Sequence, residues 1–309
     1  MAEIDNPKII FPKVRTISRS DCAFDVNKKL FLTYLVKNGG PKLHEYEEFN
    51  FIVKTLDAEN LHEFREVINP ILNINTLIGR SYTKPYGYPG DFYLIDHIYS
   101  NHVNGDKKYR NWDIYYQNQE GTMAVRNRKD YFLNQCLNLA LKKHGEKRVL
   151  ILGSGPATDV NEFLNMYTGN DISFDLVDYD QNAIDYSSAK NKKFEKLISY
   201  HKVNVLRFEP YMRYDLIWSA GLFDYFRDKH FVYLVRKYIN YVAEGGELVI
   251  GNFSTENPSK NLMEVISEWY LNYRTRKDLI RIAGNAGLQN GKVSVDAESL
   301  EINLFLKIH

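Results

Sequence analysis

The chain has 309 residues, and 40 Lys and Arg stand against 39 Asp and Glu, so the formal net charge at pH 7 is +1. A near-neutral chain is not expected to bind nucleic acid as its main partner, because that role needs a basic face. The apolar fraction of 44% and the charged fraction of 26% are those of a globular protein, which excludes general disorder. No apolar run approaches the roughly 20 residues that span a bilayer, so we expect no membrane insertion.

The cysteines and the first residues indicate a cytoplasmic protein. Residues 1–5 are polar and do not resemble a signal peptide. Cys22 and Cys136 lie far apart, which predicts two free thiols. The eight histidines form no i, i+4 pair of the kind found in helical zinc sites, so we expect no metal.

The first part of the chain has the apolar spacing of helices. Residues 1 to about 20 are predicted to be irregular, and helical patterns then run from about Asp25 to Leu77. Further helices are expected near 92–99, 112–116 and 125–143, with a polar break at 101–110.

Between two of these helices lies "SYTKPYGYPGDFYLID", residues 81–96. Residues 82–91 hold three tyrosines, two prolines and two glycines. Proline fixes φ and glycine permits unusual φ, so this segment is predicted to be a shaped loop.

After residue 144 the pattern changes to strands that alternate with helices. The expected strands are "KRVLILGSG", "FDLVDYD", "YDLIWSAG" and "GGELVIGNFS", and the tail from residue 291 suggests a two-stranded hairpin. This alternation predicts an α/β fold: a Rossmann-like, doubly wound sheet with an antiparallel terminal strand. We expect a mainly helical substrate and lid region at residues 1–124, followed by the sheet domain at residues 125–309.

The stretch "LILGSGPATDV" places Gly153 and Gly155 after a strand and before a helix, where backbone can approach a nucleotide-like ligand. Dinucleotides and S-adenosylmethionine are both bound in this way, and a simple tight turn is the alternative. A dinucleotide site would have a third glycine where Thr158 stands, and Pro156 suits a pyrophosphate poorly.

The next strands supply candidates for the rest of such a ligand. Asp178 lies 23 residues after Gly155, where a carboxylate can accept the ribose hydroxyls, whereas Asp180 is expected to cap the following helix. Asn204 could meet an adenine amino group. The small residues Ser219, Ala220 and Gly221 leave room at the end of another strand.

Taken with the terminal hairpin, residues 125–309 resemble the class I S-adenosylmethionine-dependent methyltransferases, and a nicotinamide enzyme is the alternative. Where the family often has a third loop glycine, this chain has Ala157. The resemblance implies S-adenosyl-L-methionine as cofactor. It also implies cofactor contacts from Gly153, Ser154, Gly155, Pro156, Asp178, Tyr179, Asn204, Val205, Ser219, Ala220 and Gly221.

The stretches "KPYGYPGDFYLID", "AVRNRKDYF", "SAGLFDYF", "NFSTENPSKNLME" and "EWYLNYRT" resemble a narrower group. These are the bacterial methyltransferases associated with 3-hydroxypalmitic acid methyl ester synthesis. That resemblance implies methylation of a fatty-acid carboxylate.

Several residues outside the sheet are candidates for the same site. Tyr86, Tyr88 and Asp91 could close over the sulfonium, since a cation sits well on an aromatic face; packing tyrosines and a helix-capping Asp91 are the alternative. Arg126 or its neighbour Arg128 could clamp the methionine carboxylate, or lie on a solvated helix face. Apolar residues recur at helical spacing in the amphipathic stretch 262–279, which offers three substrate contacts: Trp269, Tyr273 and Arg274.

Methyl transfer is an in-line displacement in which positioning supplies much of the rate. A carboxylate acceptor needs no base, whereas a hydroxyl or an amine must lose a proton. Asp91, Asp224 and Tyr225 are the candidate proton acceptors, although Asp224 could instead be a capping residue. Tyr88 with Tyr225 could orient the acceptor.

The sequence therefore favours a methyltransferase with a small organic acceptor: a carboxylate, a hydroxyl or an amine. A protein methyltransferase, or an enzyme transferring the aminocarboxypropyl group, is a second hypothesis. A non-catalytic cofactor-binding module is the third. The N-terminal helices could serve as the surface of a homodimer.

Overall fold

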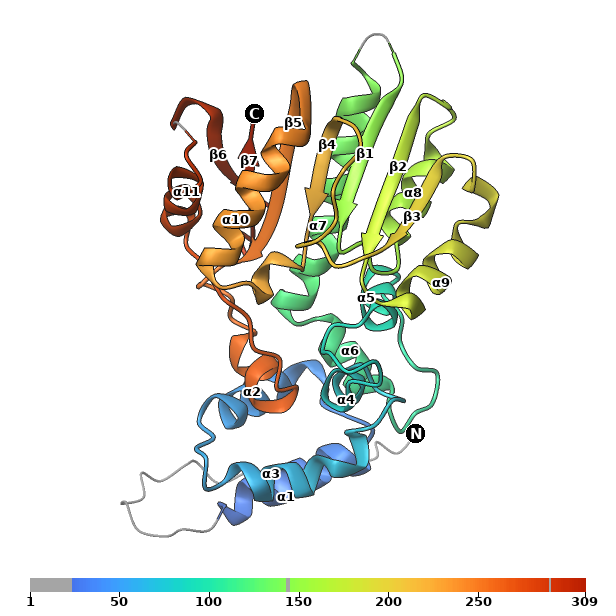
Figure 1. Ribbon diagram of the computed structural model, residues 1–309. Coiled ribbons are helices and arrows are strands. Elements are labelled where there is room, and N and C mark those ends of the chain that lie inside the picture. The colour runs from blue at the N-terminus through green and yellow to red at the C-terminus, as the bar shows by residue number, and fades with distance from the viewer. Residues whose placement is uncertain (1–23, 143–144, 289) are drawn as a thin grey trace, which may run out of the picture.

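The computed structural model describes residues 24–142, 145–288 and 290–309. A seven-stranded sheet with flanking helices forms one part of the molecule, and a helical layer lies across one end of the sheet (Figure 1). Strands β1 to β5 point their carboxyl ends toward this helical layer. The predicted α/β, Rossmann-like fold is confirmed.

The sheet has the strand order β3-β2-β1-β4-β5-β7-β6. Strands β1 to β5 are parallel, and β7 runs antiparallel between β5 and β6, so the predicted terminal hairpin is confirmed. The strands are β1 Lys147–Leu152, β2 Ile172–Asp178, β3 Ile198–Lys202, β4 Tyr214–Ser219, β5 Val242–Phe253, β6 Val293–Ala297 and β7 Asn303–Ile308. Strand β3 was not among the expected strands; it lies at the edge of the sheet and has few buried residues.

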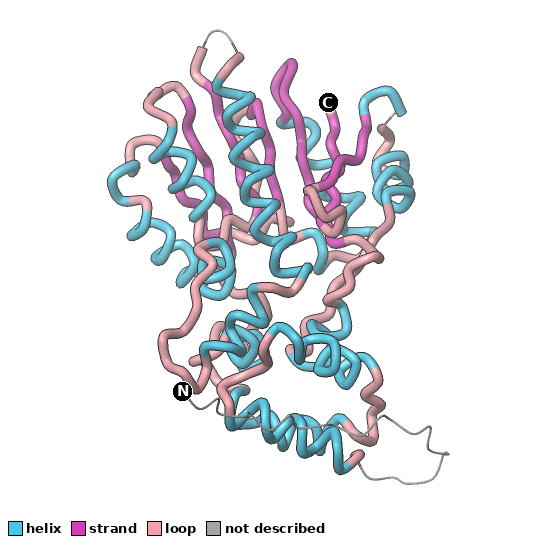
Figure 2. The backbone as a smooth tube through the Cα atoms, turned by 180° about the vertical axis from the view of Figure 1, so that it is seen from behind, coloured by secondary structure: helices cyan, strands magenta, loops and turns pink. Residues whose placement is uncertain are grey.

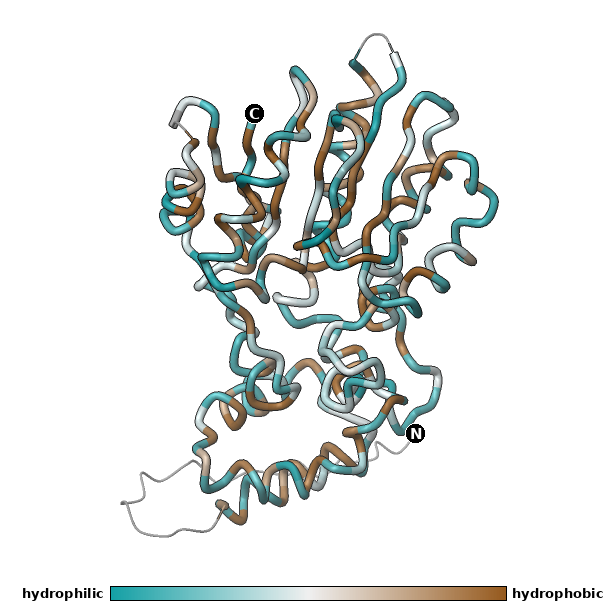
Figure 3. Tube along the Cα trace, viewed as in Figure 1, coloured by the Kyte–Doolittle hydropathy of each residue, from teal (hydrophilic) through white to brown (hydrophobic). Residues whose placement is uncertain are grey.

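Helices cover both faces of the sheet (Figure 2). One face packs on α7 (Glu120–Ala140) and α8 (Thr158–Met166), and the other on α10 (Asp228–Tyr238) and α11 (Arg276–Asn285). Helix α9 (Gln181–Lys190) contacts β2 and β3. The central strands are hydrophobic along their length because both faces are buried (Figure 3).

The helical layer has its own aromatic core. Its helices are α1 Val26–Lys37, α2 Tyr46–Lys54, α3 Leu61–Ile68, α4 Leu77–Thr83, α5 Phe92–Tyr99 and α6 Arg110–Gln117. Phe49 lies at its centre, within 5.5 Å of the Trp112 ring and 5.1 Å of the Tyr115 ring. The segment after β5 joins this core through Leu262, Met263, Ile266 and Trp269. The helical layer is therefore built from two separate parts of the chain.

Two expectations differ from the structure. The boundary expected between residues 124 and 125 falls inside α7, a single helix that reaches from the helical layer onto the sheet. The amphipathic stretch 262–279 is not one helix: a π-helix, Leu262–Ile266, ends before Glu268, whose φ is +48°. The chain then extends, and Arg274 N donates to Phe253 O at 3.0 Å, so a link to β5 replaces the helical hydrogen bonds.

The irregular start predicted for residues 1 to about 20 lies outside the described residues, as does Cys22. Cys136 is a buried free thiol. Within the described ranges, no helix combines the length and the apolar character needed to cross a membrane.

Candidate functional site

A cavity of about 360 Å³ lies where the carboxyl ends of β1, β2 and β4 meet the helical layer. The loops after these three strands line it from the sheet side, and five residues of the helical layer line it from the other: Tyr88, Gly90, Phe92, Ile95 and Tyr99. In open α/β sheets, ligands bind at this edge.

The glycine loop and Asp178 form one hydrogen-bonded unit. Gly153 and Gly155 have φ of +72° and +53°, a region that favours glycine. Gly155 N donates to Asp178 Oδ2 at 2.9 Å, and Asp180 N donates to Oδ1 at 3.0 Å. A Cβ at Gly155 would have no atom within 4 Å, so the loop backbone is open to a ligand. Asp178 therefore holds the loop while it lines the cavity.

Arg128, rather than Arg126, reaches the cavity. The Arg128 side chain is buried, its Nε donates to Tyr99 OH at 3.3 Å, and a Cβ at Gly221 would lie 2.9 Å from its Nη1. Arg126 instead donates to the Gln117 carbonyl oxygen at 2.7 Å and lies outside the cavity. A buried guanidinium with free donors suits a carboxylate.

Two buried carboxylates share the cavity with Arg128. Asp159 lies in the first turn of α8, and Asp224 lies just after β4. Burial raises the pKa of each to about 6, although Arg128 lowers both. Asp224 Oδ1 accepts a hydrogen bond from Phe253 N at 2.6 Å, which ties the loop after β4 to the end of β5.

Three hydrogen bonds hold residues 88–90 and Trp269 around the cavity. Tyr88 OH donates to Asp180 Oδ2 at 2.9 Å. Tyr225 OH donates to Pro89 O at 3.1 Å and accepts from Trp269 Nε1 at 2.8 Å. Tyr88, Tyr225 and Trp269 all line the cavity, so three of the sequence-predicted residues meet there.

Asp91 and Tyr86 lie outside the cavity. They have the roles that were expected from the sequence as the alternative, helix capping for Asp91 and packing for Tyr86. Asp91 caps α5 by accepting from Leu94 N at 2.8 Å, and it also accepts from Arg80 Nε at 3.2 Å. Both hydrogen bonds are made to Oδ1 of this buried carboxylate. Because Asp91 does not line the cavity, it is not placed to take a proton from a methyl acceptor bound there. The Tyr86 ring packs on Phe92, with centroids 4.6 Å apart.

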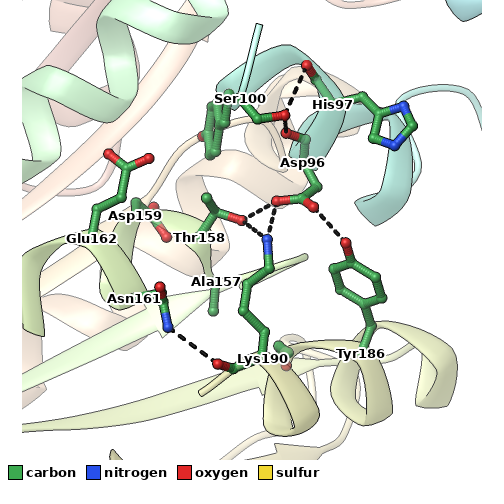
Figure 4. Close-up of polar contacts among 12 residues, drawn as sticks. Asp96, His97, Ser100, Ala157, Thr158, Asp159, Asn161, Glu162, Tyr186 and Lys190 are labelled. Carbon is green, nitrogen blue, oxygen red and sulfur yellow. Dashed lines mark hydrogen bonds and ion pairs between the residues drawn. The ribbon is translucent and has the colours of Figure 1, made fainter. Parts of the chain in front are cut away.

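Asp96 links α5 to helices α8 and α9 of the sheet domain through hydrogen bonds (Figure 4). From α5, it accepts hydrogen bonds from Thr158 on α8 and from Tyr186 and Lys190 on α9. Burial alone would raise the pKa of Asp96, but the bonds from Lys190, Thr158 and Tyr186 outweigh it and lower the pKa. The charged form is therefore favoured, and α5 is held beside the glycine loop.

Most of the remaining predicted residues also line the cavity: Ser154, Pro156, Tyr179, Asn204, Val205 and Ala220. Three do not. Ser219 Oγ donates to Leu152 O at 2.7 Å between β4 and β1. Tyr273 packs against the core of the helical layer. Arg274 is buried and donates to Asn252 Oδ1 at 2.7 Å and to Asp228 Oδ1 at 2.9 Å, so it braces the loops around β5.

Other lining residues were missed by sequence reasoning, among them Tyr99, Asp159 and Phe253. A signal for choosing Arg128 over Arg126 was present. Arg128, Phe132 and Cys136 recur every four residues and all are buried, which marks the sheet-facing side of α7. Arg126 does not lie on this side of α7.

No family model and no curated protein matches the chain. Among solved structures, the chain is similar to a possible exported protein from Bordetella parapertussis, with a TM-score of 0.61 and 14% identity over 92% of this chain and 96% of that one. It is also similar to the S-adenosylmethionine-dependent methyltransferase SibL, with a TM-score of 0.50 and 13% identity over 86% and 76% of the two chains.

A third similar structure is magnesium protoporphyrin IX methyltransferase, ChlM, from Synechocystis PCC 6803 with bound S-adenosylhomocysteine. The TM-score is 0.51 and the identity 10%, over 74% of this chain and 96% of that one. The present chain therefore has the Rossmann-like fold of these two methyltransferases. At such identities the similarity concerns the fold, and the chemistry must be argued from the side chains.

Proposed function

We propose that the chain is an S-adenosylmethionine-dependent methyltransferase that acts on a small organic acceptor. The observation that carries the proposal is the pairing of Asp178 with the open glycine loop at one cavity that also contains a buried arginine. An adenosine with an amino-acid tail needs these partners: a carboxylate for the ribose hydroxyls and a guanidinium for the tail.

The residues present fit this cofactor. Asp178 would accept from the ribose hydroxyls, and Asn204 lies on the loop after β3, where it would meet the adenine. Arg128 would hold the methionine carboxylate. Bound there, the cofactor supplies an electrophilic methyl group on a sulfonium. Tyr88 and Tyr225 line the cavity, and a cation that lies on an aromatic face is stabilised by about 0.5–2 kcal/mol.

The helical layer would act as the substrate and lid region. Its covering segment would exclude water and hold the acceptor in line with the methyl group, which favours transfer. A concave cavity of about 360 Å³, lined mostly by apolar and aromatic residues, suits a small molecule. The carboxylate, hydroxyl and amine all remain acceptors under this proposal. The likeness to the 3-hydroxypalmitic acid methyl ester group keeps the carboxylate among them.

Calorimetric titration tests the proposal. The wild-type protein and Asp178→Ala are titrated with S-adenosylmethionine, S-adenosylhomocysteine and NADH, and Asp185→Ala on the exposed side of α9 is the control. We expect micromolar binding of the first two ligands to the wild type and the control, with a loss of about tenfold or more in Asp178→Ala. Binding of NADH in their place would contradict the proposal.

A further inference from the structure

The charges of the cavity wall bear on the class of acceptor. Among the described residues that line the cavity, Arg128 is the one cation, whereas four are aspartates: Asp159, Asp178, Asp180 and Asp224. Charges inside a protein interact several times more strongly than in bulk water. A wall with this excess of carboxylates attracts cations and repels anions.

The proposed cofactor does not remove this excess. S-adenosylmethionine carries a sulfonium, an ammonium and a carboxylate, so it adds one net positive charge against an acidic excess of three in the wall. Its carboxylate would occupy Arg128. No second cation among the described lining residues then remains to pair with a carboxylate acceptor.

Asp224 is placed to receive the acceptor. It follows β4, which β1 separates in the sheet from β2 and Asp178, and Tyr225, Phe253 and Trp269 line the same cavity. Of its two carboxylate oxygens, Oδ1 accepts from Phe253 N; the hydrogen bonds found within the described ranges leave Oδ2 without a donor. A buried carboxylate with a free oxygen beside aromatic rings suits a donor group carried on an apolar body.

Resting on the methyltransferase function proposed above, we propose that the acceptor is an amine carried on an apolar or aromatic body, and that Asp224 binds the amine and takes its proton. Burial raises the pKa of Asp224 to about 6, so the carboxylate is still ionised at neutral pH and can accept a proton. The sulfonium nearby favours the neutral amine over the ammonium.

The step balances in atoms and charge. The ammonium loses one proton to the Asp224 carboxylate, and the lone pair that this frees on nitrogen forms a bond to the methyl carbon. The bond from methyl carbon to sulfur breaks, and its electron pair stays on sulfur. The products are the N-methylated ammonium and S-adenosylhomocysteine.

The test separates the acceptor from the cofactor. S-adenosylhomocysteine is titrated first; if it does not bind, the methyltransferase proposal has failed before any acceptor is added. Where it binds, the saturated protein is titrated with phenethylamine, 2-phenylethanol and phenylacetate, and with octylamine, octanol and octanoate. We expect the amine of one set to bind about tenfold or more tighter than its alcohol and carboxylate partners. A carboxylate that binds as tightly as the amine, or the absence of any preference for the amine, overturns the inference.

Asp224→Asn shows whether this carboxylate carries the preference. Asparagine keeps an oxygen for Phe253 N, so we expect a folded variant whose affinity for S-adenosylhomocysteine stays within about threefold of the wild type. The advantage of the amine over the alcohol should disappear, whereas Asp185→Asn on α9 should keep it. An amine preference that survives in Asp224→Asn contradicts the role given to Asp224.

Discussion

Tyr88 and Asp180 are 92 positions apart in the chain, yet the Tyr88 hydroxyl donates a hydrogen bond to Asp180 Oδ2 at 2.9 Å. Through Oδ1, the same carboxylate caps α9 at Asn182 N. Asp180 lies two residues beyond Asp178, which holds the glycine loop. The covering loop, residues 84–91 between α4 and α5, is therefore hydrogen-bonded next to the strand end that would bind the ribose, and we expect this loop to open when a ligand is released.

Removing the Tyr88 hydroxyl tests this link. Tyr88→Phe keeps the ring and loses the bond to Asp180, which is worth about 1–2 kcal/mol because its acceptor is charged. We expect S-adenosylhomocysteine to dissociate about five to thirty times faster, measured by stopped-flow fluorescence. Tyr270→Phe, at an exposed position, is the control. Equal dissociation rates in the two variants would show that the loop does not hold the ligand.

Two glycines of the covering loop form a matched pair. Gly90 and Gly87 have φ of +68° and +86°, so alanine is strained at either position. A Cβ at Gly90 would lie 2.4 Å from the Trp269 ring, whereas one at Gly87 would have no atom within 4 Å. We expect Gly90→Ala to weaken S-adenosylhomocysteine binding about tenfold or more and Gly87→Ala to weaken it about threefold at most, measured by calorimetry. The reverse order would mean that Trp269 does not support the loop.

The two arginines of α7 give a second comparison. Arg128→Lys keeps the positive charge but loses the paired donors, so S-adenosylhomocysteine should bind about tenfold or more weakly. Methylthioadenosine, which lacks the amino-acid tail, should bind Arg128→Lys and the wild type about equally. Arg126→Lys should leave both affinities unchanged within about twofold, because Arg126 bonds to Gln117 outside the cavity. If Arg128→Lys weakened the binding of S-adenosylhomocysteine and of methylthioadenosine by the same factor, Arg128 would have a structural role instead.

Burial of Asp224 predicts a dependence of stability on pH. Its pKa rises from 3.8 to about 6 on folding, so the folded state binds the proton more tightly than the unfolded state. Its charge therefore opposes folding above about pH 6, and this cost disappears below about pH 4. Asp224→Asn should raise the free energy of unfolding by on the order of 2 kcal/mol at about pH 7.5 and by little below about pH 4, measured by urea denaturation. A variant less stable than the wild type at about pH 7.5 would contradict this reading of the buried charge.

The sheet could be predicted because the central strands β1 and β4 are largely buried and read as apolar runs that end just before a glycine. Strand β3 was not predicted because it lies at the edge of the sheet, where polar residues interrupt its apolar pattern. The extended conformation after β5 was not predicted for another reason. The apolar spacing of this segment is helical, but the hydrogen bonds of Arg274 hold the chain in an extended form.

The site was predictable where it follows strand ends, because parallel strands bring their carboxyl ends to one edge. Gly153, Gly155 and Asp178 are of this kind. Side chains from the helical layer were harder to assign, because their direction depends on tertiary packing. Asp91 and Tyr88 are three residues apart, yet one caps a helix and the other lines the cavity.

A crystal structure of the protein with S-adenosylhomocysteine would show whether the cavity at the carboxyl ends of β1, β2 and β4 is the cofactor site. We expect the ribose hydroxyls within hydrogen-bond distance of Asp178, the amino-acid carboxylate on Arg128, and the sulfur facing the part of the cavity between Asp224 and Trp269. A ligand bound outside this cavity, or one with its ribose and carboxylate away from Asp178 and Arg128, would contradict the account.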